Sequence, residues 1–120
     1  MDNELLTIEN SPGANEGQRV LKVNGPLTLS TLFDFQNAVR AEKAPTVILE
    51  LSGVPYVDSA GLGAIINAHV SCTNAGRNLA LVGVTNRFRT LLKLTRVESV
   101  LTIFPTLEDA EKVSINPREL

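Results

Sequence analysis

Most of the reactive chemistry that this sequence offers lies in one short segment, Asp58-Ser59-Ala60-Gly61-Leu62-Gly63. An acidic residue followed by a hydroxyl and small residues is typical of a helix start, where several backbone N–H groups lack an intrahelical partner. Asp58 is a natural N-cap, since its carboxylate can accept from the amide of residue 60 or 61. Ser59 then occupies the first helical position with its hydroxyl near solvent. The segment therefore predicts an accessible serine at the positively polarised end of a helix.

A serine in that position is available to a kinase. A phosphate on Ser59 would add about −1.5 to −2 units of charge, attracted by the helix dipole and repelled by the adjacent Asp58. We expect a change of surface charge more than a refolding of the chain. A purely structural interpretation stays open, in which Asp58 only caps the helix and Ser59 only lies at a turn.

Two glycines in the first turn of this helix need a reason, because glycine costs about 1 kcal/mol relative to alanine inside a helix. Close approach of a partner backbone to Gly61 and Gly63 is one reason. Close packing of the helix on a neighbouring sheet is the other. The spacing of the residues is compatible with both.

Other uses of the serine are disfavoured. A serine hydrolase would carry a glycine two residues before its nucleophile, but position 57 is valine. His69 falls on the same predicted helix, roughly 15 Å from Ser59 along the axis, which is too far for a general base. We interpret His69 as a packed or half-exposed core residue. The sequence has no phosphate-binding Gly-x-x-x-x-Gly-Lys motif and no lysine near Ser59, so a nucleotide-binding module is only an alternative.

Composition excludes several further classes. Eleven Lys and Arg against thirteen Asp and Glu give a net charge of −2, too balanced for direct nucleic-acid binding. The one cysteine, Cys72, and the one histidine cannot form a zinc cluster, and Cys72 is expected to fill the core. No apolar run approaches the ~18 residues of a membrane span, and the N-terminus lacks a signal sequence. We expect a cytoplasmic protein without a metal, cofactor or membrane insertion, and not an enzyme.

Apolar patterning and turn residues predict the elements that position this segment. A hairpin of strands at 5–9 and 20–23 is followed by a helix that Thr28 or Ser30 caps and that ends near 44–45. The later elements are strands at 46–51, 78–84 and 100–104 and helices from Ser59 to 75–76, at 86–94, and from a Thr106 cap to 113. Strands that alternate with helices imply right-handed crossovers and parallel pairing.

The predicted fold class is α/β, with a single-layer mixed, mainly parallel sheet of about five strands, an antiparallel N-terminal hairpin and about four helices. At 120 residues the chain is expected to form one domain, over residues 1–113. Residues 114–120 are expected to form a flexible tail.

Four segments resemble the STAS family, specifically the bacterial anti-sigma factor antagonists. They are Tyr56-Val57-Asp58-Ser59-Ala60-Gly61-Leu62-Gly63 after an apolar strand, Gly25-Pro26-Leu27-Thr28, and the C-terminal stretches Leu91-Leu92-Lys93-Leu94-Thr95 and Ile103-Phe104-Pro105-Thr106-Leu107-Glu108-Asp109-Ala110. The resemblance to the family extends from about residue 5 to residue 113.

The resemblance implies a partner switch. In that family the serine corresponding to Ser59 is phosphorylated by a protein that is both an anti-sigma factor and a serine kinase. The unphosphorylated antagonist binds this kinase and frees a sigma factor, phosphorylation ends the binding, and a PP2C-type phosphatase restores it. The chain would act as a monomer or weak dimer. A STAS module of a transporter or stress-response system without a sigma factor remains the alternative.

The predicted site has Ser59 as phosphoacceptor and a partner-binding set around it. That set comprises Thr28, Asp58, Ser59, Ala60, Gly61, Leu62, Gly63, Thr85 and Asn86. Thr85 and Asn86 follow a parallel strand at its carboxyl end, the edge where open α/β sheets place their sites. A capped, solvated helix start is the alternative interpretation for these two residues.

The chain departs from the family pattern at a few positions. Thr28 stands where many members have an acidic residue near the phosphorylated serine, and Arg96 stands where a glycine commonly follows the preceding helix. Ala60 replaces a frequent Ser or Thr, which leaves Ser59 as the single candidate phosphoacceptor in the motif.

Overall fold

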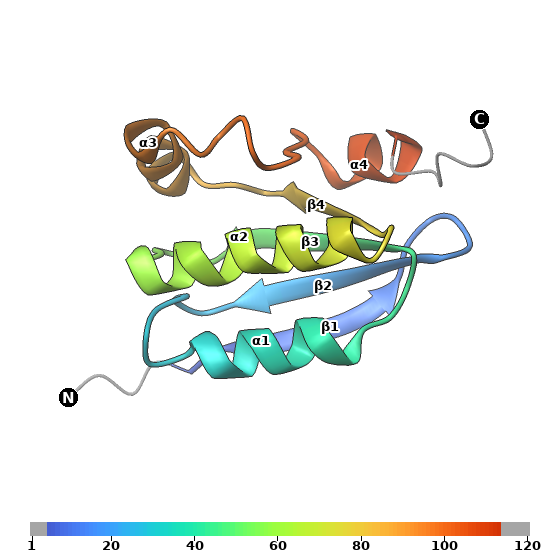
Figure 1. Cartoon of the computed structure of the whole chain (residues 1–120), viewed down its shortest axis with the longest axis horizontal. Helices are drawn as coiled ribbons and strands as arrows, with labels where there is room; N and C mark the ends of the chain where they lie inside the picture. The colour runs from blue at the N-terminus through green and yellow to red at the C-terminus, as the bar shows by residue number, and fades with distance from the viewer. Residues whose placement is uncertain (1–4, 114–120) are drawn as a thin grey trace.

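A computed structural model describes residues 5–113 as a four-stranded sheet with helices on both faces (Figure 1). The strands are β1 (Thr7–Pro12), β2 (Gln18–Asn24), β3 (Thr46–Gly53) and β4 (Asn78–Val82), and the helices are α1 (Leu32–Ala41), α2 (Ser59–Asn74), α3 (Asn86–Thr95) and α4 (Leu107–Val113). The sheet order is β1-β2-β3-β4, antiparallel between β1 and β2 and parallel elsewhere. This arrangement confirms the predicted fold class.

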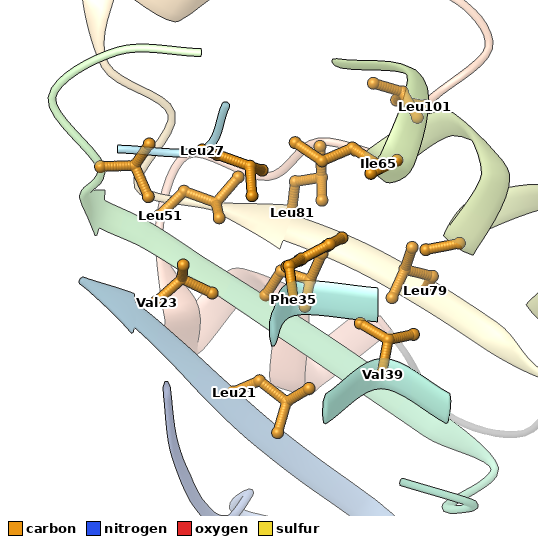
Figure 2. Packing of buried hydrophobic residues seen from close by; sticks show 14 of the residues in the cluster. Leu21, Val23, Leu27, Phe35, Val39, Leu51, Ile65, Leu79, Leu81 and Leu101 are labelled. Atoms are coloured by element: carbon orange, nitrogen blue, oxygen red, sulfur yellow. The ribbon is translucent and has the colours of Figure 1, made fainter. Parts of the chain in front are cut away.

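The sheet separates two apolar clusters, and β3 supplies side chains to both. Val47, Leu49 and Leu51 lie in the larger cluster, which Figure 2 shows between the sheet and the helices. Ile48 points the other way, into a smaller cluster that includes Ala110 of α4. Successive strand residues face opposite sides of a sheet, so a strand covered on both faces must be apolar throughout. The apolar run from Val47 to Leu51, interrupted only by Glu50, therefore has a direct structural cause.

The sheet has four strands rather than about five, because the predicted strand at 100–104 is reduced to a single bridge. Ile103 pairs with Leu81 of β4, flanked by hydrogen bonds from the Leu81 amide to the Thr102 carbonyl (2.8 Å) and from the Phe104 amide to the Leu81 carbonyl (2.9 Å). Pro105 follows Phe104 at once, and its ring fixes φ at about −65°, outside the usual range of a strand. The chain then turns into α4, whose start is capped as predicted, since the Thr106 hydroxyl accepts from the Asp109 amide at 3.1 Å.

Helix α1 begins later and ends earlier than predicted. Thr31, not Thr28 or Ser30, is its N-cap residue, and its hydroxyl donates to the Pro26 carbonyl (2.8 Å) instead of capping the helix. The helix ends at Ala41, because the backbone of its C-cap Glu42 is already extended (φ −88°, ψ 120°). The Thr31 side chain thus stabilises the loop that leads into α1, and it makes no capping hydrogen bond to the helix.

Strand β1 also differs in extent, since it runs from Thr7 to Pro12 and pairs with β2 as far as Pro12 and Arg19. Proline is tolerated there because β1 is an edge strand and its missing N–H faces no neighbour. The predicted antiparallel hairpin is confirmed, and its turn lies at residues 13–17.

Arg96 keeps the turn geometry that glycine would supply. It adopts the left-handed conformation at the end of α3 (φ 60°, ψ 29°), and its amide donates to the Lys93 carbonyl at 3.2 Å. The amide of Val97 reaches the Leu92 carbonyl at the same distance, 3.2 Å. The departure from the family pattern at this position therefore leaves the helix end intact.

The predicted tail at 114–120 lies outside the described residues. Within residues 5–113, no helix combines the length and the apolar character needed to cross a bilayer.

Candidate functional site

The carboxylate of Asp58 joins two segments that are distant in sequence. Asp58 is the N-cap of α2, and its Oδ1 accepts from the Gly61 amide at 2.8 Å. Its Oδ2 accepts from the Leu29 amide at 3.1 Å, in the loop before α1. Asp58 therefore caps its helix as predicted and also fastens the loop between β2 and α1 to the start of α2.

Backbone hydrogen bonds strengthen the same junction. The Leu27 amide donates to the Tyr56 carbonyl (3.1 Å), and the Asp58 amide donates to the Leu27 carbonyl (3.2 Å). Leu27 and Val57 form a short parallel bridge, and the Leu27 side chain is fully buried. The Thr31 hydroxyl closes the loop on its other side. The residues before Ser59 are therefore held by both main-chain and side-chain contacts.

Ser59 is the first residue of α2, and it is exposed. Both features were predicted from the sequence. Asp58, immediately before it, is half-buried and has both carboxylate oxygens bonded to amides. The hydroxyl of Ser59 is thus offered to solvent from a rigid helix start.

The two glycines of the motif differ in the space that a side chain would have at each position. A Cβ on Gly61 would lie 2.1 Å from the Leu27 carbonyl oxygen, so this glycine is needed for packing inside the chain. A Cβ on Gly63 would meet nothing within 4 Å, and Gly63 is exposed. Only Gly63 leaves room for the approach of another molecule.

Burial also divides the predicted partner-binding set. Gly61 and Leu62 are buried, which removes them from the accessible contact residues. Ser59 and Gly63 are exposed, and Thr28 and Ala60 are half-buried. Leu62 instead belongs to the larger apolar cluster.

Two exposed apolar side chains next to this junction were missed as surface residues. Leu29 and Phe33 each have a relative solvent-accessible surface of 67%. Leu29 is the residue whose amide binds Asp58, and Phe33 lies in the first turn of α1. Neither residue is in the predicted partner-binding set, because spacing in the sequence does not show that α1 turns Phe33 outward.

The start of α3 reaches the same region. Thr85 caps α3, with its hydroxyl accepting from the Phe88 amide at 3.2 Å, and Asn86 is exposed. The Arg87 guanidinium lies over the Tyr56 ring, 5.6 Å from its centroid, in the loop that leads to Asp58. Figure 1 shows the starts of α1, α2 and α3 at one end of the sheet. Thr85 and Asn86 therefore lie at the same edge of the sheet as Ser59, on a capped helix start.

His69 is half-buried on α2, as predicted, and its Nδ1 is buried without a hydrogen-bond partner. It is separated from Ser59 by nearly three helical turns of the same helix. Within residues 5–113, no three His, Cys, Asp or Glu side chains gather in a way that could hold a metal ion.

Residues 7–110 match the STAS domain family. This chain belongs to that family. A protein of Thermotoga neapolitana, named as a candidate anti-sigma factor antagonist, is 33% identical over 64 residues, which cover 53% of this chain and 57% of the relative. The anti-sigma-B factor antagonist of Staphylococcus epidermidis is 27% identical over 86 residues, covering 69% of this chain and 80% of the relative. The alignment thus spans little more than half of the Thermotoga relative.

Solved structures share the fold of this STAS domain. An anti-sigma factor antagonist from Mycobacterium paratuberculosis superposes with a TM-score of 0.79 at 21% identity, covering 91% of this chain and 93% of the other. The phosphorylated form of the Bacillus protein SpoIIAA gives 0.64 at 13% identity, with 89% and 99% covered. The murine anion transporter Slc26a9 gives 0.75 at 18% identity, with 92% of this chain but 22% of the transporter covered. At these identities the likeness establishes the shared fold alone.

The two glycines of the STAS motif give a matched test of the packing at the site. Gly61→Ala is expected to lower the free energy of unfolding by about 2 kcal/mol, because its Cβ would collide with the Leu27 backbone. Gly63→Ala is expected to raise it by up to about 1 kcal/mol, because alanine favours the helix and meets no neighbour. Urea unfolding of both variants measures the difference. Equal effects of the two substitutions would show that Leu27 does not hold α2 as described.

Proposed function

We propose that this STAS domain is an anti-sigma factor antagonist that acts in the cytoplasm as a phosphorylation-controlled partner switch. The unphosphorylated form binds an anti-sigma factor that is also a serine kinase, which releases a sigma factor. Phosphorylation of Ser59 ends the binding, and a PP2C-type phosphatase restores it. The names of the relatives support the general role, and the surface around Ser59 supports the switch.

The observation that carries the proposal is the setting of Ser59. The hydroxyl is exposed at the first position of α2, while the neighbouring carboxylate is already bonded to two amides. A kinase can therefore reach Ser59 without unfolding the helix start. Because Asp58 has its own partners, a phosphate on Ser59 need not displace it, and the fold is expected to persist.

The surroundings of Ser59 fit a protein partner. Leu29 and Phe33 are large apolar side chains exposed on the segment that Asp58 fastens to α2. Exposed apolar anchors fixed on a rigid backbone are what a protein interface uses. Gly63 adds open space on α2 next to Ser59. We propose that these residues, with Thr28, Ala60, Thr85 and Asn86, form the surface that the kinase covers.

A phosphate in the middle of such a surface would weaken the complex in two ways. A dianion buried by a partner must lose its hydration, and the adjacent Asp58 adds repulsion. The N-terminal dipole of α2 stabilises the phosphate in the free protein, where water also solvates it. The modified chain is therefore stable alone and poorly suited to the complex.

Phosphorylation of Ser59 is tested with an anti-sigma factor kinase from the same genome and labelled ATP. Wild type and Ser71→Ala, a change at another exposed serine of α2, are expected to take up label, whereas Ser59→Ala is expected to take up none. Mass spectrometry then locates the modified residue. Label retained in Ser59→Ala would place the phosphoacceptor elsewhere and refute the switch.

The effect of the charge is tested by affinity for the same kinase. Ser59→Asp is expected to weaken the complex by about 2 kcal/mol, roughly thirtyfold in Kd, because an unpaired carboxylate enters the interface. Ser71→Asp adds the same charge about 18 Å further along α2 and is expected to leave the Kd within twofold. Circular dichroism checks that both variants fold. A Kd for Ser59→Asp equal to that of wild type would contradict the mechanism.

A further inference from the structure

A hollow of about 220 Å³ lies between α1 and α2, away from Ser59. Phe35 and Val39 of α1 and Ala64 and Ala68 of α2 supply apolar side chains to it, and all four are buried. The two alanines of α2 are too small to fill all of the space opposite Phe35 and Val39 of α1. The floor of the hollow is therefore apolar and open to a small ligand.

The buried thiol of Cys72 belongs to the same floor. Burial raises the pKa of this thiol, and the nearby charge of Arg77 offsets only part of that effect. Cys72 therefore stays neutral at physiological pH and behaves as a further apolar group.

Cations line the hollow where α1 and α2 end. Arg40 and Lys43 are exposed and Arg77 is half-buried. Among the residues that the structure describes, no carboxylate forms an ion pair with any of these three. The nearest acidic residue in sequence, Glu42, is held elsewhere, since its carboxylate accepts from Asn10 (2.7 Å) and from the Ala44 amide (2.8 Å).

The carboxylate of Glu42 also has a cationic partner away from the hollow. Its carboxylate lies 3.8 Å from Arg19, and although burial raises its pKa, the hydrogen bonds and this guanidinium together hold the pKa below its usual value. The ionised carboxylate of Glu42 therefore lies against Asn10 of β1 and Arg19 of β2, and it forms no ion pair with the cations of the hollow.

Arg77 is fixed in position before any ligand arrives. Its Nε donates to the Ala44 carbonyl at 2.9 Å and its Nη2 donates to the Glu42 carbonyl at 2.7 Å. The acceptors are the carbonyl of Glu42, which is the C-cap of α1, and that of Ala44, just beyond the helix. A guanidinium held by neutral acceptors keeps its full positive charge for a further partner.

We infer that this hollow binds a small amphipathic anion, a carboxylate with a short hydrocarbon tail. The tail would lie on the apolar floor between the helices, and the carboxylate would face Arg40, Lys43 and Arg77. The volume sets the size, since a cavity of about 150 Å³ holds benzene and drug-sized ligands need about 300 Å³ or more. Octanoate has the required charge and a tail of suitable length.

Titration of the ¹⁵N-labelled chain with octanoate tests this assignment. The amides of Ala68, Ser71 and Arg77 are expected to shift saturably, and acetate and the uncharged octanamide are expected to bind at least fivefold more weakly. Shifts that do not saturate, shifts centred outside the hollow, or equal affinity for octanamide would overturn the assignment.

Charge variants complete the test, and a matched control removes two lysines of β2 and α4, away from the hollow. The double variant Arg40→Gln/Lys43→Gln is expected to raise the Kd of octanoate about five- to tenfold, because two exposed cations are removed. Lys22→Gln/Lys112→Gln removes two exposed lysines that do not line the hollow and is expected to leave the Kd within twofold. Ser59→Asp should also leave it unchanged, so the result is independent of the partner switch. A change of less than twofold in the double variant would overturn recognition by these cations.

Discussion

The site depends on one carboxylate that accepts hydrogen bonds from two segments at once. Asp58 holds the Gly61 amide at the start of α2 and the Leu29 amide before α1. A helix N-terminus and a neighbouring loop both present N–H groups that need acceptors, and a single ionised side chain satisfies one from each. Truncating such a cap typically costs about 1 kcal/mol from the helix alone. Here the same truncation would also release the loop.

This double contact explains how a small domain can keep Ser59 exposed and yet well positioned. Ser59 makes no contribution to the core, so the proposed phosphorylation would change the surface while the chain stays folded. Leu27 fills the interior beneath it, and the missing side chain of Gly61 lets the Leu27 carbonyl approach α2. Ser59 thus contributes only to the surface, whereas Leu27 and Gly61 provide the packing beneath it. That division suits the proposed switch, in which one added charge would control binding.

Local signals in the sequence were sufficient for features that depend on adjacent residues. The apolar run of β3, the cap at Asp58 and the exposure of Ser59 follow from patterns within a few positions. The bond from Leu29 to Asp58 spans 29 positions in sequence and has no local signature. The role of Gly61 was open for the same reason, because the carbonyl that requires a glycine belongs to Leu27. The predicted fifth strand at 100–104 is too long, because β-branched residues there favour an extended backbone, whereas the pairing ends before Pro105.

The hydrogen exchange rates of the Leu29 and Gly61 amides test the central role of Asp58 most directly. In wild type both amides are expected to be protected, since each donates to the carboxylate. In Asp58→Ala both are expected to lose protection together, while the amides of β3 keep theirs. If the Leu29 amide exchanges at the same rate in wild type and variant, Asp58 does not join the loop to the helix, and this account of the site is wrong.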